Sequence, residues 1–349
     1  MARRDAAIRE LCAKFVCVRM THMRGVDLEL FQFDYDMTWA GFFMHADGAI
    51  YGRYGSRTTG KKGADSLISV PSFKRAMERA LELHAGYPGN KAALAGKKGA
   101  PFPWPTVEKM PSSAGKFAEP GDKGCIHCHH AATGLRRSLA MTKKPLPDPL
   151  LWTWPLAENV GMRLDLDEGT RIVEVQPGTP GAKAGLKAGD SVTAMNGQPI
   201  LSHADVQWVL QNAPDRGEVK LDYRRDGAAA QAVLLLDGPW RRTDLSWRES
   251  MWDARPGIWL VGMTADERAK AGLGEGVLAL RIKWVIPRGL AKKAGFLDGD
   301  VLVEFDGRTE PMDESLFVAR VRQKYAPGSK IPVAVLRGGK RLPLTLEVD

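Results

Sequence analysis

The chain has 349 residues, of which 44% are hydrophobic and 26% charged, and its net charge is +9. This length predicts two or three domains, and the composition is that of an ordinary globular protein. The basic residues form short clusters instead of long runs, so nucleic acid is not among the expected partners. No apolar stretch reaches the roughly 18 residues of a membrane span.

The first part of the chain predicts alternating helices and strands. Apolar residues at helical spacing indicate a helix over residues 4–15, and the run that follows predicts a buried strand over 15–20. Residues 38–44 and 49–53 read as two strands of a hairpin, with Asp47-Gly48 in the turn. Pro71 stands in the first turn of a helix predicted to end near Gly86.

The segment from Trp39 to Gly55 resembles the strand-turn-strand of the thioredoxin superfamily. That resemblance implies a partial thioredoxin-like α/β unit over residues 1–90. The family's first strand and its Trp-Cys-x-x-Cys are missing, and Met37 stands where the family has a cis-proline. The start of the chain is therefore expected to be truncated. Cys12 and Cys17 are expected to be buried apolar residues, and no disulfide reductase activity is expected.

Residues 91–150 are rich in proline and glycine and predict a loop-rich linker, with a short helix over 131–141. Within the linker, Cys125, Cys128 and His129 form the Cys-x-x-Cys-His pattern of c-type haem attachment. Two thiols at this spacing can each add to one porphyrin vinyl group, and the next imidazole can bind the iron. Met110 and Met141 are the candidates for the sixth ligand, and the sequence does not decide between them.

Three other interpretations of this motif remain open. It could be half of a zinc site, although no second pair of ligands follows at a workable distance. It could be a thiol-disulfide redox pair, although loop residues precede it instead of a strand. It could also be a surface loop with coincidental cysteines. Haem c would require export from the cytoplasm, yet residues 1–20 contain no signal-peptide core.

The last part of the chain contains an internal repeat. Residues 184–190 (Ala-Gly-Leu-Lys-Ala-Gly-Asp) recur as residues 294–300 (Ala-Gly-Phe-Leu-Asp-Gly-Asp), and Asn196-Gly197 recurs as Asp306-Gly307. These residues resemble the PDZ domains appended to bacterial high-temperature-requirement proteases. The resemblance implies two small β-barrels with helices, over residues 151–240 and 245–349. No Gly-Asn-Ser-Gly or Gly-x-Ser-x-Gly motif accompanies them.

The PDZ resemblance implies that a peptide carboxyl terminus adds as a strand to the domain. In the first copy the carboxylate loop, the binding strand and the helical wall of the groove fall on seven residues, which are Val160, Gly161, Met162, Arg163, Leu164, Val206 and Leu210. In the second copy Gly257-Ile258-Trp259-Leu260 is the nearest match. The expected partners are protein carboxyl termini or exposed peptides.

The sequence thus predicts an α+β multidomain protein that is exported to the periplasm and binds peptides. We expect it to carry one covalent haem c for electron transfer or redox sensing, with a redox partner protein. An alternative is a PDZ adaptor that holds a structural or transported metal at Cys-x-x-Cys-His without haem. A third is a thiol-disulfide oxidoreductase. No catalytic residue is predicted, and an enzymatic activity is not favoured.

Overall fold

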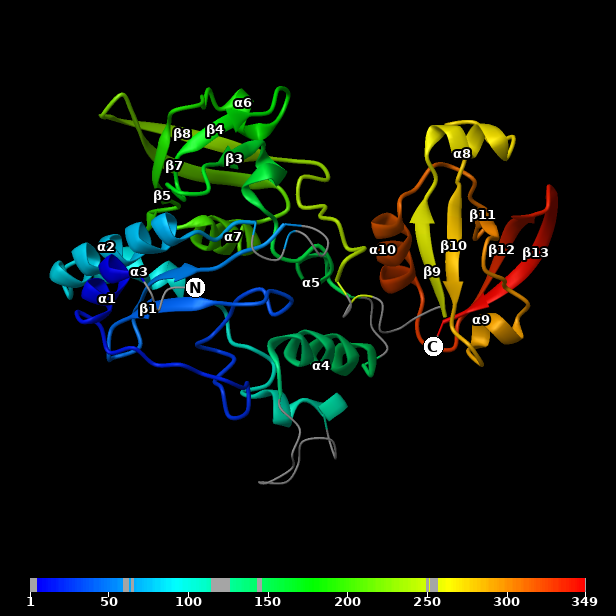
Figure 1. Ribbon diagram of the computed structural model, residues 1–349, viewed down its shortest axis with the longest axis horizontal. Coiled ribbons are helices and arrows are strands. Elements are labelled where there is room, and N and C mark those ends of the chain that lie inside the picture. Colours follow the sequence, from blue (N-terminus) through cyan, green and yellow to red (C-terminus); the bar gives the residue numbers. More distant parts are fainter. Residues whose placement is uncertain are drawn as a thin grey trace. The chain divides into compact units, whose positions relative to one another are not determined.

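The computed structural model describes residues 5–58, 63, 66–113, 126–142, 146–248, 251 and 257–348 (Figure 1). The chain divides into two compact units, and each mixes helices with strands. The first comprises residues 1–132 and 152–243, and the second residues 133–151 and 244–349. Within the described ranges, no helix has the length and apolarity that crossing a membrane requires.

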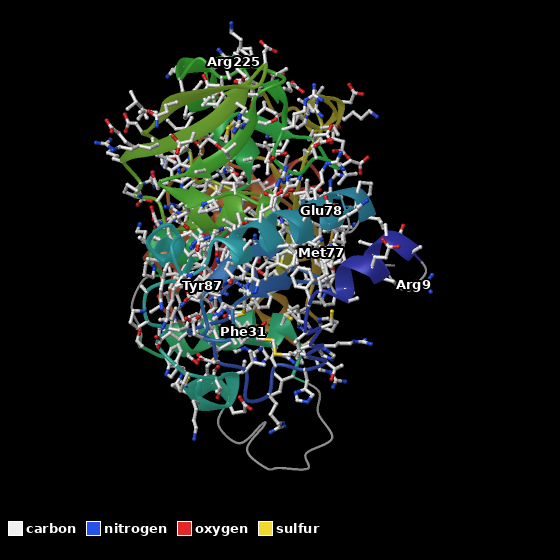
Figure 2. The ribbon with its side chains drawn as sticks, turned by 90° about the vertical axis from the view of Figure 1, so that its left-hand side faces the viewer. Arg9, Phe31, Met77, Glu78, Tyr87 and Arg225 are labelled. Atoms are coloured by element: carbon white, nitrogen blue, oxygen red, sulfur yellow. The ribbon has the colours of Figure 1, made fainter. Side chains whose placement is uncertain are left out.

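The first unit begins with α1 (Ala6–Cys12), the hairpin strands β1 (Gly41–Met44) and β2 (Ile50–Tyr54), α2 (Val70–Ala85) and α3 (Lys91–Leu94). The hairpin and α2 confirm the predicted elements to within a few residues. Ser69 caps α2 with its side chain, and a proline occupies the first turn. The helix is amphipathic, because Met77 is 3% exposed while the neighbouring Glu78 side chain is 46% exposed (Figure 2).

The buried strand predicted over residues 15–20 is absent. Val16 and Val18 are 94% and 81% exposed, and no strand of the described chain pairs with this segment. Cys17 is exposed and Cys12 half-buried, so the expected burial of both cysteines is also wrong. The reason is physical: β-branched residues favour a strand only where a partner strand and an apolar face receive them. In the described residues before Cys128, β1 and β2 form a sheet of their own.

Residues 126–151 contain two of the described helices, α4 (Cys128–Ala140) and α5 (Asp148–Leu151). The helix predicted over residues 131–141 is confirmed, although it begins three positions earlier, at the second cysteine of the motif. The boundary between the two units falls inside α4.

The rest of the first unit is a small β structure with two helices. Its elements are β3 (Met162–Leu164), β4 (Ile172–Val175), α6 (Pro180–Lys183), β5 (Ser191–Met195), β6 (Gln198–Pro199), α7 (His203–Gln211), β7 (Gly217–Arg225) and β8 (Ala228–Leu236). One sheet has the order β6-β5-β7-β8, and β3 pairs with β4 in a second sheet. All pairs are antiparallel. The predicted helix that carries Val206 and Leu210 is confirmed as α7.

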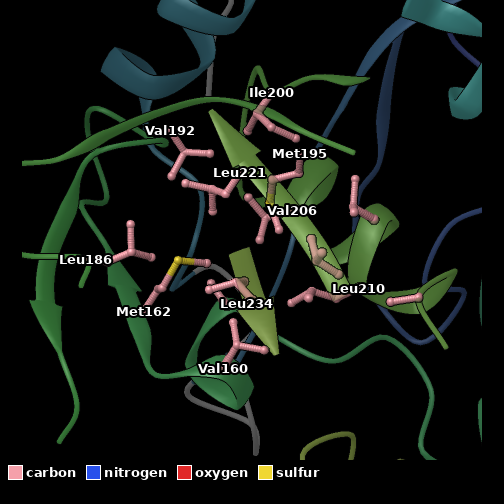
Figure 3. Close-up of a cluster of buried hydrophobic side chains, with 14 of the residues drawn as sticks. Val160, Met162, Leu186, Val192, Met195, Ile200, Val206, Leu210, Leu221 and Leu234 are labelled. Carbon is pink, nitrogen blue, oxygen red and sulfur yellow. The ribbon is translucent and has the colours of Figure 1, made fainter. Parts of the chain in front are cut away.

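A single buried cluster fills this β structure. It combines alternate residues of the strands with residues of α7, and it includes Met195 of β5 and its cross-strand partner Leu221 of β7, both labelled in Figure 3. Alternation places one side of each antiparallel strand in the core and the other in solvent. The cluster continues into the segment before β3 through Val160, which is fully buried.

The second unit contains a five-stranded sheet in the order β13-β12-β11-β10-β9. Its elements beyond α5 are β9 (Ile258–Gly262), α8 (Ala265–Lys270), β10 (Leu280–Val285), α9 (Leu290–Lys293), β11 (Val301–Phe305), α10 (Glu314–Lys324), β12 (Lys330–Arg337) and β13 (Lys340–Glu347). In Figure 1, α10 lies beside β9, the edge strand. Thr264 and Glu267 form a capping box at the start of α8, a helix without buried residues.

The sequence repeat is also a repeat of contacts. In the first unit Arg225 binds both carboxylate oxygens of Asp190 at 2.8 Å and the carbonyl oxygen of Gly185 at 2.8 Å. In the second unit Arg337 binds Asp300 and the carbonyl oxygen of Gly295 in the same way, at 2.7 Å for each bond. Both aspartates are buried, and a buried carboxylate is stabilised when a guanidinium binds both of its oxygens. We call this arrangement of Asp, Arg and Gly carbonyl the arginine fork.

Candidate functional site

The turn that leads into β3 is held in a fixed shape. Gly161 has φ of +84°, and a Cβ at this position would collide with the side chain of Thr179. Its N–H donates to the carbonyl oxygen of Glu158 over 2.9 Å. The amide of Asn159 donates to the carbonyl oxygens of Trp240 at 3.0 Å and Arg242 at 2.7 Å. Glycine is therefore required here, and the turn is anchored to the segment after β8.

The outer edge of β3 presents backbone groups away from β4. Gln176 donates its N–H to the carbonyl oxygen of Gly161 over 2.9 Å, and the next paired residues are Met162 with Val175. Hydrogen-bonded and non-hydrogen-bonded pairs alternate along an antiparallel ladder, so Met162 directs its N–H and C=O outward.

The same holds for Leu164, although an irregularity interrupts the ladder before it. Its partner Ile172 makes its backbone hydrogen bonds on the side away from β3. The N–H of Ile172 donates to the carbonyl oxygen of Asp190 at 2.7 Å, and its carbonyl oxygen accepts from the N–H of Gly189 at 2.8 Å. Leu164 thus also points its backbone groups outward. No strand of the described chain occupies this edge.

The side chains predicted to contact a peptide divide into two groups. Val160, Met162, Leu164, Val206 and Leu210 belong to one buried cluster, and none is more than 4% exposed. Four of these five are labelled in Figure 3. Arg163 instead lies on the exposed face, where it forms an ion pair with its cross-strand neighbour Glu174 at 2.8 Å. The role of all these residues, and of Gly161, in peptide binding stays a prediction.

An acidic side chain stands in the turn before Gly161. Burial raises the pKa of Glu158, and the nearby charge of Arg163 opposes the rise only in part. A peptide carboxylate held at this turn would therefore lie near a group that changes its charge with pH. The sequence prediction did not include Glu158.

Helix α7 is fixed from its other side by buried charges. Lys97 Nζ lies 2.8 Å from Asp205 Oδ1, and neither side chain is more than 1% exposed. The other oxygen of Asp205 accepts from the backbone N–H of Leu201 at 2.9 Å. The Arg53 guanidinium lies 3.6 Å from the centre of the Trp208 ring, and burial lowers the pKa of Arg53 to about 10.

The sequence prediction missed this cluster. Lys97 stands in one of the short basic clusters of the sequence, where a lysine is usually solvated, but here it is buried. Asp205 stands in the first turn of α7, where an acidic residue is expected for its effect on the helix dipole alone. No local pattern pairs two residues 108 positions apart.

The Cys-x-x-Cys-His motif is described only in part, because Cys125 lies outside the described residues. Cys128 and His129 begin α4, and burial raises the pKa of Cys128. The rings of His127 and His129 lie 5.7 Å apart and nearly parallel. Met110 is 1% exposed and Met141 62% exposed. The described residues contain no group of three or more His, Cys, Asp or Glu side chains placed to hold a metal ion.

Comparison with known proteins identifies one domain directly. The family model described as PDZ domain matches residues 158–236. A probable periplasmic serine protease do/HhoA-like of Haemophilus influenzae is 31% identical over 181 residues, which cover 52% of this chain and 35% of the relative. The periplasmic pH-dependent serine endoprotease DegQ of Escherichia coli is 33% identical over 185 residues, covering 52% of this chain and 37% of the relative.

Among solved structures, the HtrA-type protease AlgW with tripeptide is 30% identical over 26% of this chain and 30% of that chain, with a TM-score of 0.23. The chain thus spans about a third of the length of these two curated relatives.

The relatives contradict the predicted electron-transfer function. The curated relatives named above, and a probable periplasmic serine endoprotease of Pseudomonas savastanoi, are serine proteases of the periplasm. The haem-based function and the thioredoxin-like assignment are therefore wrong, and the redox partner finds no support. The resemblance to PDZ domains of high-temperature-requirement proteases is confirmed. Residues 158–236 form a PDZ domain, similar to those of periplasmic HtrA-type serine proteases.

Proposed function

We propose that this protein binds extended peptides, and that its PDZ domain captures the carboxyl-terminal segment of other proteins as a strand added to β3. The observation that carries the proposal is the outward direction of the backbone groups of Met162 and Leu164. Strand addition to such an edge is the way in which PDZ domains recognise peptides. The turn at Gly161 stands at the end of β3 where a terminal carboxylate would lie.

The proposal includes a second PDZ domain at residues 245–349. It is supported by the arginine fork, which both repeats contain. It is also supported by a matching backbone hydrogen bond, because the N–H of Ile286 donates to the carbonyl oxygen of Gly257 at 2.8 Å as that of Gln176 donates to Gly161. Gly257 also has a left-handed φ of +75°. The remaining proposed boundaries are an N-terminal domain at residues 1–90, a linker at 91–150 and the first PDZ domain at 151–240.

We further propose that the chain works in the periplasm and contributes recognition of peptides, not their cleavage. The curated relatives named above are periplasmic. The part shared with them includes the PDZ domain, and the sequence has neither Gly-Asn-Ser-Gly nor Gly-x-Ser-x-Gly. Degradation of unfolded casein by the purified protein, abolished by a serine-directed inhibitor, would contradict this part of the proposal.

The groove assignment is tested by titrating fluorescent peptides against the whole protein and measuring fluorescence polarisation. Peptides with an apolar carboxyl-terminal residue should bind in the micromolar range. Amidation of the carboxyl terminus should weaken binding about tenfold, because it removes a charge-assisted hydrogen bond. Equal affinity of the amide and the free acid would refute carboxylate recognition.

The matched variants are Gly161→Glu and Gly227→Glu. Both glycines have a left-handed φ, but a Cβ meets Thr179 at Gly161 and open space at Gly227. Gly161→Glu should abolish binding at the first PDZ domain, and Gly227→Glu should keep it. Thermal unfolding of both variants checks that the domain still folds. Unchanged binding by a folded Gly161→Glu protein would move the site away from β3.

A further inference from the structure

The second repeat differs from the first at one pair of exposed positions beside the edge strand. In the first repeat Arg163 and Glu174 face each other across β3 and β4. In the second repeat Trp259 and Trp284 face each other across β9 and β10. Their side chains are 53% and 43% exposed. An ion pair of the first repeat is thus replaced by two indoles in the second.

These positions correspond by their backbone bonds as well as by their pairing. In both repeats the residue two places before the outer member of the pair is a left-handed glycine, Gly161 or Gly257. In both, an irregularity of the ladder follows the pair. Ile282 corresponds to Ile172. Its N–H donates to the carbonyl oxygen of Asp300 at 2.7 Å, and its carbonyl oxygen accepts from the N–H of Gly299 at 2.8 Å, as Ile172 does with Asp190 and Gly189.

The outer edge of β9 offers a short stretch of outward backbone groups. Because Ile286 pairs with Gly257, alternation directs the N–H and C=O of Ile258 and Leu260 away from β10. The N–H of Gly262 points the same way, and Glu314 at the start of α10 already accepts it at 2.5 Å. A peptide can therefore pair with Ile258 and Leu260, and Glu314 limits the pairing to a segment of about three residues.

Trp259 lies between these two pairing residues. A peptide residue opposite Trp259 would form a non-hydrogen-bonded pair, in which the side chains approach most closely. Its side chain would lie on the face that carries Trp259 and Trp284, because neighbouring strands share their alternation. With the terminal residue opposite Ile258, the residue in this position is the penultimate one.

We propose that the second repeat selects peptides whose penultimate residue is aromatic, and that Trp259 and Trp284 are the specificity-determining residues. Aromatic pairs across strands are favoured beyond the apolar area that they bury. The first repeat presents Arg163 and Glu174 at this place and has no such preference. The inference rests on the proposed strand addition and adds to it the chemical class of the ligand.

The test uses the whole protein with Gly161→Glu, so that the first PDZ domain does not contribute. Fluorescent decapeptides that end in Ala-Trp-Val should bind about three- to tenfold more tightly than those ending in Ala-Asp-Val or Ala-Lys-Val. Adding Trp259→Arg and Trp284→Glu installs the pair of the first repeat at exposed positions, and should abolish the preference. Leu235→Arg, which changes a 63% exposed strand residue elsewhere, should keep it.

Backbone methylation of the peptide checks the register. Methylation of the backbone N–H of the terminal residue, or of the third residue from the carboxyl terminus, should abolish binding, because these N–H groups face β9. Methylation of the N–H of the penultimate residue should not. Tight binding of the lysine peptide, or a preference that survives the double exchange, would overturn the inference. So would a protein dimer that the double exchange dissociates without peptide, because a second copy would then occupy the edge. If no peptide binds even the wild-type protein, the proposed function itself fails.

Discussion

Lys97 and Asp205 form an ion pair with an N–O distance of 2.8 Å, in which neither side chain is more than 1% exposed. Arg53 is a second buried cation at this place, and its backbone N–H donates to the same Asp205 oxygen at 3.1 Å. Asp205 belongs to α7 of the PDZ domain, whereas Lys97 and Arg53 precede the matched residues 158–236. The wall of the PDZ domain opposite β3 is therefore built on residues outside the matched domain.

Removal of the Asp205 carboxylate should strongly destabilise the first unit. Asp205→Ala leaves Lys97 buried without its partner, and we expect the free energy of unfolding to fall by about 3–5 kcal/mol. Urea unfolding followed by tryptophan fluorescence measures this. The control is Asp237→Ala, which breaks a pair with Arg216 whose side chains are 75% and 81% exposed. It should change the free energy by less than about 0.5 kcal/mol. Similar small effects of both variants would contradict the buried pair.

Peptide affinity should depend on pH through Glu158. Burial raises the pKa of Glu158, so the side chain loses its negative charge earlier than an ordinary glutamate as the pH falls. The neutral form no longer repels a peptide carboxylate at Gly161, and we expect binding to strengthen about three- to tenfold from pH 8 to below that pKa. Glu158→Gln should bind tightly at both pH values. A wild-type affinity that is flat with pH while Glu158→Gln also changes nothing would argue against this role.

The arginine fork of the first PDZ domain should stabilise it in a pH-dependent way. Burial alone would raise the pKa of Asp190, but the bonds from Arg225 and from the backbone N–H of Lys187 outweigh it, and the net shift is downward. A carboxyl group with a lowered pKa stabilises the fold above its unfolded pKa, and this contribution is lost as the pH falls through the folded pKa.

Arg225→Met should therefore lower the free energy of unfolding at pH 7, and by much less at a pH low enough to protonate Asp190 in the folded protein. Urea unfolding at the two pH values measures the difference. Arg216→Met, at an exposed ion pair, serves as the control and should have little effect at either pH. A loss of equal size at both pH values would mean that Arg225 acts by packing and not through Asp190.

Thiol labelling should separate the cysteines by their exposure. Cys17 is exposed and should react rapidly with a maleimide in the native protein. Cys128 should react slowly, because it is half-buried and burial raises its pKa. Mass spectrometry of digests taken over time gives the order, and labelling in urea shows that each thiol is reactive when the chain is unfolded. Slow labelling of Cys17 would restore the buried strand that the sequence predicts over residues 15–20.

The elements that could be predicted from the sequence are those with a local cause. The β1–β2 hairpin has its Asp47-Gly48 turn, α2 has a proline in its first turn, and the repeated Gly-Asp turns precede β5 and β11. The strand predicted at Val16 and Val18 failed because its stability depends on a partner that the local pattern does not report.

The candidate site was predictable in position but not in detail. The pattern around Gly161 located the turn and β3, because only glycine fits that conformation. The burial of Lys97 and the pairing of Trp259 with Trp284 depend on tertiary register, which the sequence does not encode in any short window. The motif at Cys125 misled the functional prediction, because a short spacing pattern describes possible chemistry without the pocket that chemistry requires.

Helix α8 offers a practical handle on the second unit. It extends the connection between β9 and β10, has no buried residues, and follows Gly262, where Glu314 closes the free part of the edge. The first repeat joins the equivalent strands β3 and β4 by a short turn without a helix. A biotin acceptor tag inserted after Lys270 should leave the sheet intact, and would immobilise the protein on a sensor surface with the outward groups of Ile258 and Leu260 still accessible.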